Sequence, residues 1–84
     1  MKKHIILGVH ICDRLKRAVD VQTLLSQYGK HVKTRVGLHE PEGPTEPNGL
    51  LLLEMWGDEK RCYELADKLN AIEGVEVQKM VFEH

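Results

Sequence analysis

The sequence predicts an α+β fold in which two helices cover one face of a four-stranded antiparallel sheet. Two observations lead to this prediction. Short runs rich in β-branched residues and leucine occur at four places along the 84 residues, and two intervening stretches carry apolar residues at helical spacing. The order is strand, helix, strand, strand, helix, strand, and we expect a single domain over residues 1–84. Right-handed crossovers in this order build a ferredoxin-like sandwich.

The first strand is predicted over residues 4–11, HIILGVHI. A helix is expected to begin near Arg14, because Asp13 is a good N-cap residue. Gly29 stands where a C-cap glycine belongs. The apolar positions between these ends are three or four residues apart and share one stripe of the helix. They are Leu15, Ala18, Val21, Leu25 and Tyr28.

The second strand is predicted over residues 31–38, where apolar and polar positions alternate. Alternation assigns Val32, Thr34, Val36 and Leu38 to one face, and Lys33, Arg35 and Gly37 to the other. The polar stretch at 39–48 contains all three prolines and predicts a long acidic hairpin tip. It is longer than an ordinary hairpin loop, so the alternative is a segment that folds over a ligand or partner.

The third strand is predicted over residues 50–56, and its four leucines in a row are typical of a strand buried on both sides. Asp58 is expected to cap the second helix, which Gly74 ends. The fourth strand is predicted over residues 75–82. The second helix has an apolar stripe at helical spacing, made of Cys62, Leu65, Ala66, Leu69 and Ile72.

Two helices can cover only one face of the sheet. The helix side is predicted to take Ile5, Leu7, Val9 and Ile11, and the opposite side Ile6, two of the leucines at 50–53, Met80 and Phe82. A contiguous exposed apolar patch usually marks an interface, so we expect a homo-oligomer, a dimer or tetramer, formed through the sheet. The alternative is partial cover by the hairpin loop or the C-terminus.

Composition excludes several classes of protein. Twelve basic and thirteen acidic residues nearly cancel, and the basic run at 30–35 is interpreted as a solvated strand face, so direct nucleic-acid binding is not expected. The apolar run at 5–11 is too short for a membrane span, and no signal-peptide pattern follows it. Cys12 and Cys62 do not form a disulfide framework. We expect a cytoplasmic protein with reduced thiols.

Several strings occur in a fixed order along nearly the whole chain: Asp13-Arg14 with Ala18 one turn on, VQTLL at 21–25, RVG at 35–37 and LNAIEGVEV at 69–77. In these strings the chain resembles the small ACT-like iron-only hydrogenase system regulators. Those proteins are related in fold to ACT domains and to the ligand-binding domain of the nickel-responsive repressor. The resemblance implies an oligomeric regulatory module without catalytic residues. ACT domains often bind amino acids at subunit interfaces.

His10 and Cys12 are the candidate metal ligands. They are two residues apart, so on a strand they point to the same side, and both residue types bind nickel, zinc or iron. Two ligands do not complete a site, and the others would come from His31, His39 or a neighbouring subunit. The alternative is a strand-end thiol beside a histidine in a subunit contact.

Four residues are candidate ligand-binding groups: Arg14, Arg35, Gly37 and His39. We expect Arg35 on the side of the sheet that the helices leave uncovered, where it either pairs with Glu54 across the neighbouring strand or holds a carboxylate bidentately. Gly37 either permits close backbone approach or marks a bulge. Arg14 is suited to a carboxylate or phosphate, and His39 opens the long hairpin.

Catalysis finds little support in the sequence. Ser26 is the only serine and lies late in a helix, and no glycine-rich phosphate loop is present. We expect no enzyme and no cofactor. The sequence therefore predicts a regulatory ACT-like module that oligomerises and binds a small ligand or a protein partner. The alternative is metal sensing or handling through His10 and Cys12, and a small enzyme is a third hypothesis.

Overall fold

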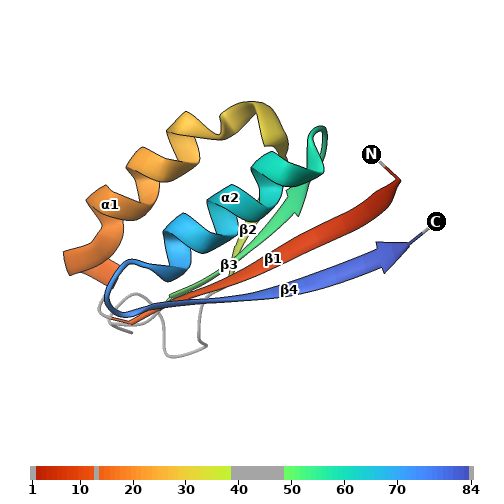
Figure 1. The fold of residues 1–84 in the computed structure, drawn as a ribbon. Coiled ribbons are helices and arrows are strands. Elements are labelled where there is room, and N and C mark those ends of the chain that lie inside the picture. Colours follow the sequence, from red (N-terminus) through yellow and green to blue (C-terminus); the bar gives the residue numbers. More distant parts are fainter. Residues whose placement is uncertain (1, 13, 39–48, 84) are drawn as a thin grey trace.

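The computed structural model describes residues 2–12, 14–38 and 49–83, with the backbone alone for residues 14–16. Its elements follow the predicted order and confirm the ferredoxin-like α+β fold (Figure 1). They are β1 (Lys3–Ile11), α1 (Arg14–Gln27), a 3-10 turn η1 (Gly29–His31), β2 (Val32–Leu38), β3 (Gly49–Met55), α2 (Glu59–Asn70) and β4 (Val75–Glu83). The predicted hairpin tip at 39–48 and the predicted cap Asp13 lie outside the described residues.

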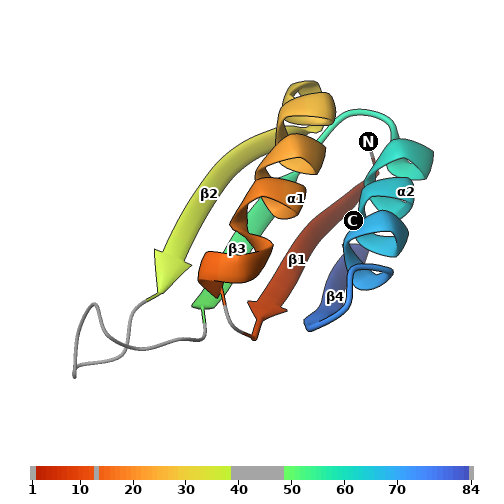
Figure 2. The same cartoon turned by 90° about the vertical axis from the view of Figure 1, so that its left-hand side faces the viewer.

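The four strands form one sheet in the order β2-β3-β1-β4, and every neighbouring pair is antiparallel. Both helices lie on the same side of this sheet, which leaves its other face without a covering helix (Figures 1 and 2). In Figure 2, α1 runs over the β3 side of the sheet and α2 over the β1 and β4 side. In the part of the chain that the structure describes, no helix is long and apolar enough to cross a membrane.

The core lies between the sheet and the helices. The four β1 residues predicted on the helix side are buried, and so are the α2 residues Cys62, Leu65, Ala66 and Leu69. The stripe of α1 is partly different from the prediction. Val21, Leu25 and Tyr28 are buried, but Ala18 is exposed. Leu24 also packs against the core, so the centre of the buried stripe lies closer to Leu24 than predicted. At ~100° of rotation per residue, Ala18 lies roughly 70° from that centre.

The ends of the helices are set by local hydrogen bonds. Asp58 is the predicted N-cap of α2, and its Oδ1 accepts a bond from the Lys60 amide at 3.0 Å. The prediction that Gly74 ends α2 is wrong, because the helix ends at Asn70 with Ala71 as its C-cap. Gly74 lies beyond the helix and turns the chain into β4 with φ of +84°. Gly29 does not cap α1 in a left-handed conformation. The chain tightens into η1 instead, where the His31 amide donates to the Tyr28 carbonyl at 2.9 Å.

A bulge in β2 changes which side chains share a face. Val32 pairs with Met55, but Thr34 already pairs with Glu54, so Lys33 is an extra residue on this strand. Val32 therefore faces the helices, and the alternation predicted from position 32 fails at this point. Beyond the bulge, Thr34, Val36 and Leu38 share the face of Glu54, while Arg35 and Gly37 point to the helix side.

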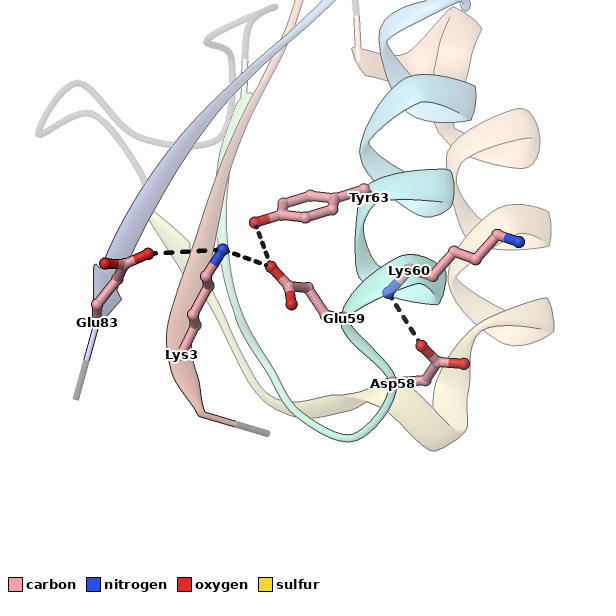
Figure 3. Close-up of polar contacts among 6 residues, drawn as sticks. All are labelled: Lys3, Asp58, Glu59, Lys60, Tyr63 and Glu83. Carbon is pink, nitrogen blue, oxygen red and sulfur yellow. Dashed lines mark hydrogen bonds and ion pairs between the residues drawn. The ribbon is translucent and has the colours of Figure 1, made fainter.

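A group of charged residues connects α2 to the neighbouring strands β1 and β4 (Figure 3). Lys3 Nζ lies 2.8 Å from Glu59 Oε1 and 3.6 Å from Glu83 Oε1, and the Tyr63 hydroxyl donates to Glu59 Oε1 at 3.1 Å. The hydrogen bond from Lys3, and then the one from Tyr63, lower the pKa of Glu59 from its ordinary value. The same bond raises the pKa of Lys3. The group connects the N-terminal strand, α2 and β4.

Candidate functional site

The helix-free side of the sheet, here called the open face, presents three rows of side chains. The strand register fixes their order from β2 across to β4. The rows are Thr34–Glu54–Ile6–Met80, Val36–Leu52–Gly8–Gln78 and Leu38–Leu50–His10–Glu76. Apolar residues fill most of the centre, while a carboxylate and a histidine lie toward each end. This is the surface on which the sequence predicted an apolar patch.

The apolar side chains of this surface are well exposed for their size. Val36 is 44% exposed, Leu38 45%, Met80 47% and Phe82 54%. Phe82 lies opposite His4 and extends the patch beyond the first row. The predicted members Ile6, Met80 and Phe82 are confirmed together with Leu50 and Leu52. The β2 bulge adds Val36 and Leu38, because it turns them to this side.

A hollow of about 340 Å³ lies on the open face where Gly8 lacks a side chain. His10, Leu50, Glu76 and Gln78 surround it. Gln78 Nε2 donates to Glu76 Oε2 at 3.1 Å, which holds the amide and the carboxylate together on the β4 side. Leu50 makes the opposite wall apolar. Such a hollow suits a small ligand that places N–H or O–H donors on Glu76 and an apolar edge on Leu50.

At the other end of the open face, His4 and Glu54 form a hydrogen bond. His4 Nε2 lies 2.9 Å from Glu54 Oε2. The hydrogen bond with His4, and then one from Thr34, lower the pKa of Glu54 from its ordinary value. Glu54 is therefore a carboxylate that already has partners within the chain. Covering it with another surface costs less than covering an unpaired charge.

His10 and Cys12 lie together as the sequence predicted, with His10 Nδ1 3.9 Å from Cys12 Sγ. Cys12 is exposed. Within residues 2–12, 14–38 and 49–83, no three His, Cys, Asp or Glu side chains are close enough to hold a metal ion. His31 cannot join this pair in the same chain. It lies at the far end of the sheet, where its Nδ1 is 3.4 Å from the Trp56 carbonyl.

The predicted ligand-binding residues do not gather around the hollow. Arg35 lies opposite Leu53, and Gly37 opposite Leu51, so both face the helix side of the edge strand. The predicted pair between Arg35 and Glu54 is wrong, because the bulge places Thr34 opposite Glu54. Arg14 is the first residue of α1 and only its backbone is described. His39 lies outside the described residues.

Three residues of the hollow were not predicted: Gly8, Glu76 and Gln78. Gly8 could have been recognised, since it interrupts a run of β-branched and leucine residues and so marks a gap in one face. Glu76 and Gln78 alternate with the valines of the last strand. Their place beside His10 and Gly8 depends on the register between β1 and β4, which the pattern of one chain does not contain.

No protein-family model matches the chain, and no curated protein matches its sequence. Several solved structures do match the chain. One is the uncharacterized protein TM1266 from Thermotoga maritima, with 29% identity, a TM-score of 0.80, and coverage of 94% of this chain and 96% of that chain. Another is CPII, a nitrogen regulatory PII-like protein from Thiomonas intermedia bound to ADP, AMP and bicarbonate. It has 16% identity, a TM-score of 0.58, and coverage of 94% and 93%. The likeness to CPII is one of fold.

Proposed function

We propose that this protein is a regulatory, non-enzymatic module that assembles with copies of itself through the open face and binds a small ligand there. The observation that carries the proposal is the set of exposed apolar side chains on a sheet face that no helix covers. Val36 and Leu38 lie on the edge strand β2, and Met80 and Phe82 lie on the opposite edge strand β4. Ile6, Leu50 and Leu52 lie between them on the same face, and a continuous apolar surface of this kind usually marks an interface.

The size of the open face supports a second copy as its occupant. Strands of seven to nine residues, at ~3.3 Å per residue and ~4.8 Å apart, give a footprint of roughly 500 Å² per copy. Two such faces bury roughly 1,000 Å² in total, which reaches the lower size of specific interfaces. Glu54 already accepts hydrogen bonds from His4 and Thr34 within each chain, which lowers the cost of covering this carboxylate with a second copy.

The hollow beside Gly8 supports the ligand-binding part of the proposal. A second copy packed on the open face closes this hollow and excludes water from Glu76 and Gln78. The PII-like neighbour CPII is a regulatory protein bound to small molecules, which is the same class of function. We also propose a link to the iron-only hydrogenase system, because the sequence resembles the ACT-like regulators of that system. We propose a cytoplasmic location, which the free thiols of Cys12 and Cys62 support.

A matched pair of variants tests the assembly. Val36→Glu introduces a charge on the open face, and we expect self-association to weaken by at least about a hundredfold. Val19→Glu makes the same change at a 75% exposed position of α1, on the opposite layer, and should leave self-association unchanged. Sedimentation equilibrium measures both. Equal association constants for the two variants would contradict the proposal.

Metal sensing is the second candidate function, and the 3.9 Å contact between His10 and Cys12 favours it. Both atoms can bind nickel or zinc, and a second copy can supply further ligands. Elemental analysis of protein purified without chelator tests this reading. Bound metal that is lost in Cys12→Ser supports it, while metal-free wild-type protein that does not take up added nickel contradicts it.

A further inference from the structure

A second hollow lies on the helix side of the molecule, in the layer opposite the open face. Its volume is about 300 Å³. The end of α1 and the 3-10 turn η1 form one wall, and α2 forms the other. The residues that line it are Gln27, Tyr28, Lys30, His31, Arg61 and Lys68. We call this hollow the basic pocket. None of its residues belongs to the open face.

The basic pocket concentrates positive charge in a chain whose formal net charge is −1. Lys30, Arg61 and Lys68 are cations that come from two separate parts of the fold. Among the residues that the structure describes, Arg61 has the carboxylate of Glu64 as its partner, and no ion pair involves Lys30 or Lys68. Three cations and one carboxylate leave an excess of two positive charges.

The pocket's groups are held in place by one another. Glu64 Oε2 accepts bonds from Arg61 Nη1 at 3.0 Å and from the Tyr28 hydroxyl at 3.3 Å. Lys68 Nζ lies 5.3 Å from the centre of the Tyr28 ring, which is buried. Arg61, Glu64 and Lys68 are spaced three and four residues apart, so they lie along one side of α2. Arg61 has five N–H donors, and its bond to Glu64 leaves others available.

We propose that the basic pocket binds the phosphate group of a small phosphorylated molecule. A phosphate monoester carries about −1.5 to −2 charges at neutral pH, which matches the excess of two positive charges in the pocket. Its oxygens suit the planar donors of Arg61 and the ammonium groups of Lys30 and Lys68. The volume holds the phosphate group, and the rest of the molecule extends from the mouth. This site goes beyond the proposed function, because it does not require the open face.

The test is an NMR titration of backbone amide signals with inorganic phosphate, at an ionic strength held constant with chloride. We expect saturable shifts at Tyr28–His31 and at Arg61–Lys68. Lys30→Gln and Arg61→Gln should each weaken binding about tenfold. Lys60→Gln removes the same charge from the residue beside Arg61, outside the pocket, and should leave binding unchanged. Glycerol phosphate should bind at the same amides, and glycerol should not.

Two results would overturn the proposal. One is the absence of saturable shifts at these amides in the wild-type protein. The other is equal weakening by Lys60→Gln and Arg61→Gln, which would mean a general effect of net charge. Arg61→Gln also removes a contact of Glu64, but Lys30→Gln leaves the Glu64 bonds intact and gives an independent answer. Repeating the titration in Val36→Glu separates this site from the assembly: phosphate binding persists there if the pocket acts alone, and its loss in that variant would contradict an independent site.

Discussion

Gly8 lies opposite Leu52 in the register of β1 and β3, at the centre of the open face. A Cβ added at Gly8 would lie 3.8 Å from the Gln78 carbonyl oxygen and 3.9 Å from Leu52 Cδ2, which are ordinary van der Waals distances. A methyl group at this position therefore fits the single chain without a clash. What it changes is the hollow and any surface that packs over it.

Substitution of Gly8 should consequently separate folding from assembly. Gly8→Ala is expected to raise the free energy of unfolding by about 0.5–1 kcal/mol, because glycine loses more backbone freedom on folding. Gly8→Lys should still fold, but it places a charge at the centre of the open face and should abolish self-association. Urea denaturation and sedimentation velocity measure the two effects. A Gly8→Lys protein that assembles like the wild type would contradict the role given to this face.

Two glycines that both follow helices should respond in opposite ways to alanine. Gly74 has φ of +84°, and its added Cβ would lie 3.4 Å from Arg17 Nε and from the Cys12 carbonyl oxygen. Gly74→Ala should destabilise the fold by about 1–3 kcal/mol. Gly29 has no atom within 4 Å of an added Cβ and lies outside the left-handed region. Gly29→Ala should be neutral or slightly stabilising, as thermal denaturation of both variants would show.

The contacts of Glu59 predict how stability depends on acid. Its native pKa lies below the ordinary value of 4.5, so the unfolded chain binds more protons than the native chain between these two pKa values. The stabilisation from Glu59 is complete at pH values above the ordinary pKa, and it is lost as the pH falls through the lowered native pKa. Glu59→Gln should therefore lower the free energy of unfolding at neutral pH, and that free energy should fall less steeply as the pH is lowered. The pKa values of Glu54 and Glu64 are lowered too, so part of the acid loss remains.

Urea denaturation at a series of pH values from neutral to acid measures this dependence. Tyr63→Phe removes one of the two hydrogen bonds to Glu59 and should give an intermediate curve. Parallel plots of unfolding free energy against pH for Glu59→Gln and the wild type in the acid range would show that the contact between Lys3 and Glu59 does not stabilise the fold.

The two thiols should differ sharply in reactivity. Cys12 is exposed, whereas Cys62 is fully buried and lies 3.8 Å from the Trp56 carbonyl oxygen. Burial raises the pKa of the Cys62 thiol, which further lowers its reactivity. A thiol-specific chromogenic reagent should therefore modify one cysteine per native chain and both in denaturant. The native reaction should disappear in Cys12→Ser, and equal rates for both thiols in native protein would contradict the burial of Cys62.

Much of the fold follows from patterns that the chain displays locally. The alternation in β1 places Ile5, Leu7, Val9 and Ile11 on one face, and helical spacing identifies the buried stripe of α2. Asp58 is recognisable as a cap because its side chain acts on an amide two residues away. These features depend on neighbours in sequence, so the sequence alone predicts them.

The bulge in β2 could not be predicted in the same way. Val32 and Val36 are both apolar, so the two-residue period continues on either side of Lys33 and conceals the extra residue. Only the pairing with β3 shows that Val32 and Val36 face opposite sides, and this reverses the placement of Arg35. The basic pocket could not be predicted from the sequence for a similar reason. Lys30 and Arg61 are far apart in the chain and meet through the packing of α1 against α2.

The most direct test of the central claim is native mass spectrometry of the wild-type protein, purified without oxygen or chelator. It reports the number of chains and any bound mass in one measurement. We predict a species of two or four chains, which the Val36→Glu variant converts to single chains. A monodisperse single chain at every concentration would show that the open face is not covered by a second copy, and would contradict the proposed function.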